Sequence, residues 1–120
     1  MKKRIIIFMM ALLLVVPLAM AFESSWQSAE KTATATVTTG AGVFHGLIVS
    51  SDGTNAVTVD IYDNTSAAGK LMIPTWTVTT SSSNRVQSLS IEPPVRFTNG
   101  IHVVITCAGT MSYMVYFNKL

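Results

Sequence analysis

Apolar and polar side chains alternate with a period of two in three segments of the sequence, residues 57–62, 101–107 and 111–118. Successive side chains of a β-strand point to opposite faces, so this period predicts strands that bury one face. Composition agrees, because residues 22–120 contain 11 Val, 6 Ile and 15 Thr but only 4 Leu. β-Branched side chains favour strands over helices. The sequence therefore predicts an all-β fold.

Clusters of Gly, Asn, Asp and Ser separate the expected strands at the intervals typical of an antiparallel β-sandwich or a small barrel. We predict a single antiparallel β-sandwich, jelly-roll or immunoglobulin-like, with about seven or eight strands. Residues 22–31 could form a short helix or an edge strand, or serve as a flexible lead-in. The expected strands cover residues 31–38, 43–50, 56–62, 70–79, 85–91, 101–107 and 110–118.

Prolines mark two places where the expected strands should be irregular. Pro74 lies inside an expected strand and would remove a hydrogen-bond donor from the ladder, so we expect an edge strand or a strand bent at this residue. Pro93 and Pro94 are expected to interrupt the chain before Phe97.

The N-terminus has the organisation of a bacterial secretory signal peptide. A positively charged segment, residues 1–4, precedes 18 uncharged and mostly apolar residues, which include an Ala-Met-Ala cleavage motif near their end. We predict cleavage between Ala21 and Phe22, which gives a signal peptide at residues 1–21 and a β domain over residues 22–120. An apolar run of this length also just spans a bilayer, so an uncleaved anchor is the alternative. Either route predicts an exported protein that is periplasmic, secreted or surface-associated.

Removal of the signal peptide would change the net charge from +2 to −1, because three of the eight basic residues and none of the six acidic residues lie within it. No run of basic residues remains, so the electrostatic signature of a nucleic-acid-binding protein is missing. The single cysteine, Cys107, cannot form a disulfide within its own chain, and it excludes a metal site built from several cysteines. We therefore expect no nucleic acid, no metal and no cofactor.

Common catalytic motifs are also missing from the sequence, and we expect that the protein is not an enzyme. Cys107 shares its face of the expected strand with apolar residues, whereas His102 points to the other face, so we predict a buried and unreactive thiol. A disulfide with another chain and a catalytic thiol are the alternatives. Asp52, Asp60 and Asp63 could offer oxygen ligands to calcium, but turn formation explains Asp52 and Asp63 well enough.

Three aromatic residues, Tyr62, Trp76 and Tyr116, are the candidate binding residues. Each falls where the alternation points away from the neighbouring apolar side chains. Exposed aromatic rings on a sheet can stack on sugars or anchor a protein partner, and the alternative is that they pack in the core or between subunits. Val104 and Met114 also interrupt the polar faces of their strands, which favours an assembling protein.

Four segments of the chain carry a resemblance. They are GVFHGLIVSSDGTNAVTVDIYDNTSAAG (residues 42–69), IPTWTV (73–78), PVRFTNGI (94–101) and SYMVY (112–116). These segments resemble small β-rich proteins common in the gene sets of tailed phages and prophages, and the likeness covers most of residues 42–117. It implies a virion-associated or decoration-type structural role, with no enzymatic activity and no catalytic residues. A capsid component assembled in the cytoplasm needs no signal peptide, so residues 1–21 indicate an exported version of the module.

Together these features predict a non-enzymatic exported structural or binding module that acts through surface contacts, exposed strand edges or self-association. The alternative is a carbohydrate-binding module that uses Tyr62, Trp76 and Tyr116. The expected partners are another protein, a second copy of the chain or a glycan. Contact with a membrane is expected only through an uncleaved signal segment.

Overall fold

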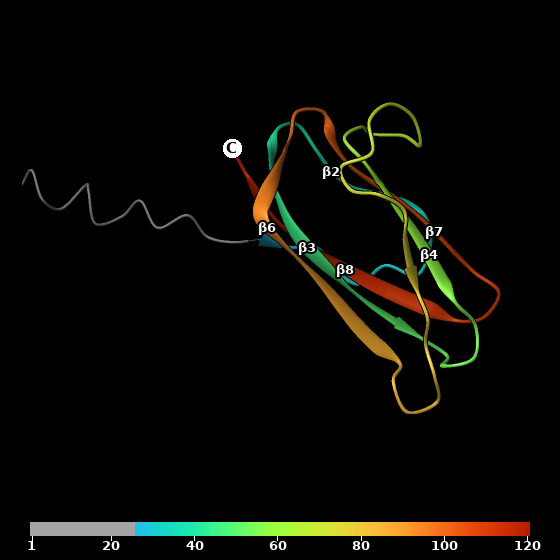
Figure 1. The fold of residues 1–120 in the computed structure, drawn as a ribbon. Helices are drawn as coiled ribbons and strands as arrows, with labels where there is room; N and C mark the ends of the chain where they lie inside the picture. The colour runs from blue at the N-terminus through green and yellow to red at the C-terminus, as the bar shows by residue number, and fades with distance from the viewer. Residues whose placement is uncertain (1–25) are drawn as a thin grey trace, which may run out of the picture.

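The computed structural model describes residues 26–120, which fold into two antiparallel sheets of four strands each, packed face to face (Figure 1). We call them sheet A, in the order β1-β8-β3-β6, and sheet B, in the order β2-β7-β4-β5. Sheet A contains β1 (Trp26–Gln27), β8 (Met111–Lys119), β3 (Gly42–Ser51) and β6 (Val86–Phe97). Sheet B contains β2 (Ala35–Thr39), β7 (Gly100–Cys107), β4 (Val57–Tyr62) and β5 (Trp76–Val78). The predicted all-β class is confirmed.

The core lies between the two sheets and is built from the inward side chains of the alternating strands. Val57, Val59 and Ile61 of β4 are fully buried, and Val103 and Val115 lie in the centre of β7 and β8. The period of two that we read in these three segments is therefore the pattern of burial in the folded chain. Larger side chains complete the core: Phe44, Leu47, Phe97, Ile101, Tyr113 and Phe117.

Strand β5 is much shorter than the expected strand over residues 70–79. It begins at Trp76, two residues after Pro74, and it lies at the edge of sheet B as predicted. The residues before it run irregularly, yet Met72 and Ile73 are buried. This segment therefore covers the core between the sheets without joining the hydrogen-bonded ladder.

The predicted interruption at Pro93 and Pro94 is confirmed for the pairing with β3, which passes from Ser90 directly to Val95 and leaves residues 91–94 without a partner on that strand. The extended conformation of β6 nevertheless continues through both prolines to Phe97, at the outer edge of sheet A, where β6 pairs only with β3 among the described strands. A proline on an edge strand can direct its missing donor away from the ladder, so the strand need not end there.

A β-bulge at His45 changes the phase of β3. The pairing of β3 with both neighbouring strands shifts between Phe44 and Gly46. Phe44 and Leu47 are both fully buried although they are three residues apart, which strict alternation would forbid. The bulge brings both side chains into the core, as an extra residue in a strand can do.

The predicted signal peptide and its cleavage position between Ala21 and Phe22 lie outside the described residues. Of the segment 22–31, the described part follows the edge-strand alternative, since Trp26 and Gln27 form β1 and Lys31 bridges to Tyr113. Within residues 26–120 there is no helix with the length and apolar character needed to cross a membrane.

Candidate binding surface

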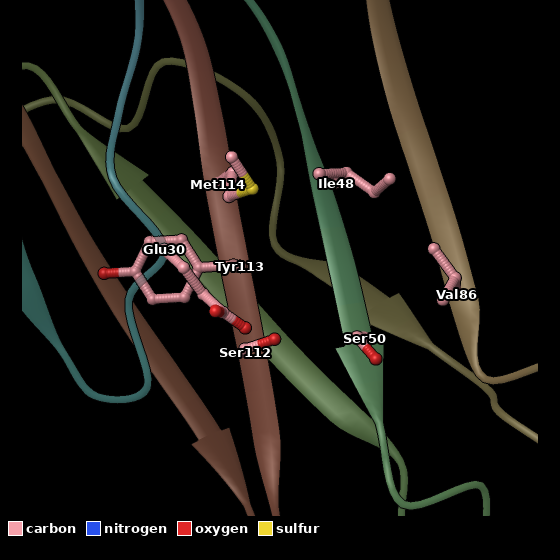
Figure 2. Close-up of a pocket in the computed structure, with 7 residues that line it drawn as sticks. All are labelled: Glu30, Ile48, Ser50, Val86, Ser112, Tyr113 and Met114. Carbon is pink, nitrogen blue, oxygen red and sulfur yellow. The ribbon is translucent and has the colours of Figure 1, made fainter.

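The outer face of sheet A carries an apolar patch, which we define as Ile48, Val86, Met114 and Tyr116. Val86 and Tyr116 are exposed by 52% and 38%, which is high for apolar and aromatic side chains on a sheet. Ile48 pairs directly with Met114 across β3 and β8. Figure 2 shows Met114, Ile48 and Val86 on three neighbouring strands, with Glu30 near Tyr113 at one side. A pocket of about 260 Å³ lies here, so this face offers apolar surface to a partner.

The outer face of sheet B is mostly polar, with Val104 and Tyr62 as exceptions, and some of its side chains hydrogen-bond one another. Thr58 of β4 lies directly between Thr77 of β5 and Thr106 of β7, so three threonines form one row. Nearby, the hydroxyl of Thr75 donates to the carboxylate of Asp60. The hydroxyl of Thr36 is hydrogen-bonded to His102 Nδ1 at 2.9 Å, and His102 pairs across the strands with both Thr36 and Tyr62. Two pairs of side chains, Thr75 with Asp60 and Thr36 with His102, therefore satisfy each other by hydrogen bonds.

The three predicted aromatic residues do not form one site. Tyr62 lies on the outer face of sheet B, opposite His102, whereas Tyr116 lies on the outer face of sheet A. Trp76 does not point away from the core as its sequence neighbours suggested. It pairs directly with the buried Val59, so it lies on the inner face of sheet B, and its ring packs against the core. The pairing of β5 with β4, which is not visible in the sequence, determines this orientation.

The free edge of β6 is the longest strand edge in the described part of the chain (Figure 1). Its first half, residues 86–91, contains no charged residue and no proline. Its second half contains Glu92, Pro93, Pro94 and Arg96, which are residue types that discourage strand pairing. The other sheet edges are short: β1 has two residues, β5 three and β2 five.

The cysteine and the two histidines are held apart. Cys107 is half-buried and packs against the core, and its sulfur accepts a hydrogen bond from the Gly109 amide at 3.4 Å. His102 points to the opposite face of β7, as predicted, and His45 belongs to the other sheet. No nucleophile–base pair forms among these three side chains.

The acidic residues Asp52 and Asp63 organise turns. The backbone amides of Asn55 and Thr54 and the side-chain amide of Asn55 donate to the Asp52 carboxylate, at 2.8 to 3.0 Å. These hydrogen bonds lower the pKa of Asp52 from 3.8 to about 2, because they stabilise the charged form. Between residues 26 and 120, no group of three or more His, Cys, Asp or Glu side chains could hold a metal ion.

Asp63 connects its own loop to the turn between β6 and β7. Partial burial acts to raise the pKa of Asp63, but hydrogen bonds from the amides of Asn99 and Thr98 and from the Thr98 hydroxyl outweigh it and lower the pKa. The two amide bonds measure 2.8 and 2.9 Å. This carboxylate therefore joins segments 35 residues apart in the sequence.

Comparison with models of known protein families, with curated proteins and with solved structures finds no match to this chain. The surface of this chain is therefore the source of evidence about its function. Two features of that surface escaped sequence reasoning, namely the free edge of β6 and the side chains that the bulge at His45 presents. The sequence does contain one signal for the free edge of β6, because residues 86–91 are uncharged and are followed closely by two prolines, which sheets tolerate mainly on edge strands.

Proposed function

We propose that this protein is an exported, non-enzymatic structural module that associates with a second copy of itself through the edge of β6. The observation that carries the proposal is the run of six uncharged residues, 86–91, on an edge strand that pairs on one side only among the described strands. Unpaired amides and carbonyls on such an edge are a template for another strand. Assembly through this edge supplies the partner that the β6 ladder lacks.

A second copy fits this edge because the strand is self-complementary. In an antiparallel pair centred on Leu89, each Leu89 faces its counterpart, and Ser88 of each copy faces Ser90 of the other. Leu89 and Ile91 are only partly buried against the core, so pairing would cover their apolar surface. No like charges would be opposed in this segment, and the contact would be isologous, as in most symmetric dimers.

The strand order supports a jelly-roll assignment within the β-sandwich class. Orders β1-β8-β3-β6 and β2-β7-β4-β5 place the first and last strands side by side and interleave two Greek keys. Jelly rolls occur in viral capsid and lectin domains, where they serve assembly and recognition. This architecture is compatible with the resemblance to virion-associated proteins, and the N-terminal residues 1–21 support export of the module.

The test is light scattering on size-exclusion chromatography of residues 22–120 over a wide range of concentration. We expect a dimer that S88K/S90K converts to a monomer, because each lysine would face another lysine across the interface. The matched control T77K/T106K adds the same charge at exposed positions on the outer face of sheet B, and it should leave the dimer intact. A wild-type protein that is monomeric at every concentration would overturn the proposal, as would equal loss of the dimer in both variants.

A carbohydrate-binding module is the competing function, and the same protein tests it. The separation of Tyr62, Trp76 and Tyr116 over two sheets and an inner face leaves no shared aromatic platform for a sugar ring. A monomer that binds a glycan and loses that binding in a Tyr62→Ala or Tyr116→Ala variant would favour the competing function.

A further inference from the structure

A second pocket, of about 310 Å³, lies on the outer side of sheet A where β6, β3 and β8 meet. The residues lining it are Val43, His45, Pro94, Arg96, Asn118 and Leu120. Val43 pairs with Arg96 on one side and with Asn118 on the other, so these three side chains form one row across the sheet. The pocket is within the size range of small-molecule sites, at its lower end.

Two polar atoms in this pocket are buried without a hydrogen-bond partner among the described residues. They are Nε2 of His45 and Oδ1 of Asn118. A buried polar atom without a partner costs free energy, and most native proteins avoid it. The two side chains come from neighbouring strands and both line this pocket, so a ligand seated there can satisfy both atoms once the side chains turn toward it. By contrast, His102 on sheet B is hydrogen-bonded to Thr36.

The β-bulge explains how His45 comes to line this pocket. It is the additional residue between Phe44 and Gly46, which both pair with residues of β8. Gly46 has a φ of 149°, and a Cβ atom at this position would overlap the carbonyl oxygen of Leu89. Bulges often redirect a side chain next to a functional site. Here the bulge places an imidazole beside Val43 and Asn118 on the outer side of β3.

The charges and shape of the pocket select the ligand. Arg96 is the one charged side chain among the six described lining residues, so the pocket favours an anion. Its guanidinium has the fork geometry that matches a carboxylate, and His45 Nε2 can donate to the same group. Asn118 Oδ1 needs a donor, which a hydroxyl group beside the carboxylate would supply. Val43 and Pro94 offer an apolar wall to a carbon ring.

We propose that this pocket binds a sugar acid, a ring that carries a carboxylate next to hydroxyl groups, with Arg96 and His45 on the carboxylate and Asn118 on a hydroxyl. The site uses the second half of β6, whereas the proposed dimer uses residues 86–91. The two proposals can therefore fail separately. S88K/S90K should abolish the dimer and leave ligand binding unchanged.

The experiment is a titration of isotope-labelled protein with galacturonate, followed through the imidazole nitrogen signals. The chain has two histidines, so His102 serves as an internal reference for His45. We expect the His45 signals to shift and saturate while the His102 signals stay in place. Arg96→Gln should weaken binding about tenfold or more, because it removes a charge-assisted hydrogen bond. Arg85→Gln, the matched control, should bind as the wild type does.

Other ligands test the chemistry. Galactose, which lacks the carboxylate, should bind much more weakly than galacturonate, and lactate, which lacks the ring, should fall between the two. If galactose binds as tightly as galacturonate, the pocket does not recognise the carboxylate. If lactate binds as tightly as galacturonate, the pocket does not recognise the ring. Either result would overturn the proposal of a sugar acid. Absence of a His45 shift, an equal shift of both histidines or equal losses in R96Q and R85Q would overturn the site itself.

Discussion

The outer faces of the two sheets differ in how their side chains are satisfied. On sheet B, Thr36 is hydrogen-bonded to His102, and Thr75 donates a hydrogen bond to Asp60. These polar side chains therefore have partners within the protein. On sheet A, Val86 is half exposed and Tyr116 also faces outward. Both faces contain histidine and tyrosine, so residue type does not distinguish them. The difference is that sheet A leaves apolar surface exposed and two polar atoms without a described partner, and for this reason we place the proposed binding surfaces on sheet A.

The largest effect should come from the bulge at His45 in sheet A. Gly46→Ala places a Cβ atom against the carbonyl of Leu89 at a positive φ, so the β3–β6 pairing has to shift. We expect a loss of at least about 3 kcal/mol in the free energy of unfolding, measured by urea denaturation. Gly40→Ala, at a turn where a Cβ atom meets nothing within 4 Å, should cost only about 1 kcal/mol. Equal losses would contradict the role of the bulge.

The aromatic residues should separate by orientation. Trp76→Ala removes a ring that packs against the core, and we expect a loss of about 2 kcal/mol, below the range for fully buried rings. Tyr116→Ala removes an outward ring on sheet A and should cost about 0.5 kcal/mol or less. Thermal or urea unfolding of the two variants measures the difference. A larger loss in the Tyr116 variant would reverse our assignment of inner and outer faces.

Replacing a polar side chain by an apolar one should change the free energy of unfolding in opposite directions on the two faces. On sheet B, Thr36→Val leaves His102 Nδ1 without its hydrogen bond and should destabilise the protein by about 1 kcal/mol. On sheet A, Asn118→Leu removes a buried oxygen that has no described partner, so it should stabilise the protein by about 1 kcal/mol. Urea midpoints of the two variants provide the measurement. Destabilisation by both would mean that Asn118 is satisfied in solution.

The smallest effect concerns Asp52, in the turn that joins β3 of sheet A to β4 of sheet B. Its pKa falls from 3.8 to about 2 on folding, because amides of Asn55 and Thr54 stabilise the charged carboxylate. A lowered pKa in the folded state contributes stability above about pH 4, and this contribution is lost as the pH falls toward about 2. Asp52→Asn should therefore flatten the stability curve between these values.

The control for this measurement is Glu92→Gln, which changes an exposed carboxylate on β6 with no described hydrogen-bond partner. Because this variant also removes one carboxylate charge, it separates the effect of the Asp52 hydrogen bonds from that of net charge. If the pH dependence of stability is the same in the wild type and in the Asp52→Asn variant, the hydrogen bonds of the turn do not lower the pKa of Asp52 as its geometry implies.

Local periodicity was sufficient to predict β4, β7 and β8, because buried and more exposed side chains alternate along most of each strand. It could not predict the bulge, since the sequence around His45 has no strict alternation and the phase change depends on both neighbouring strands. Trp76 shows the same limit, because its direction follows from pairing with Val59, 17 positions earlier.

The candidate surfaces were still harder to predict, because they join distant segments. Arg96, Val43 and Asn118 share one row of sheet A although they are far apart in the sequence. Cross-strand neighbours of this kind are set by the order of strands in the sheet, which local patterns do not encode. The uncharged run at residues 86–91 was visible, but its position at an edge was not.

The most direct test of self-association is a mixture of two variants that should each be monomeric. S88K/S90K and S88E/S90E place like charges across the proposed β6 contact, whereas a mixture places lysine opposite glutamate at both positions. We predict that native mass spectrometry of the mixture shows a one-to-one heterodimer and little of either homodimer. A mixture in which both variants remain monomeric, beside a wild-type dimer, would contradict pairing in the register centred on Leu89.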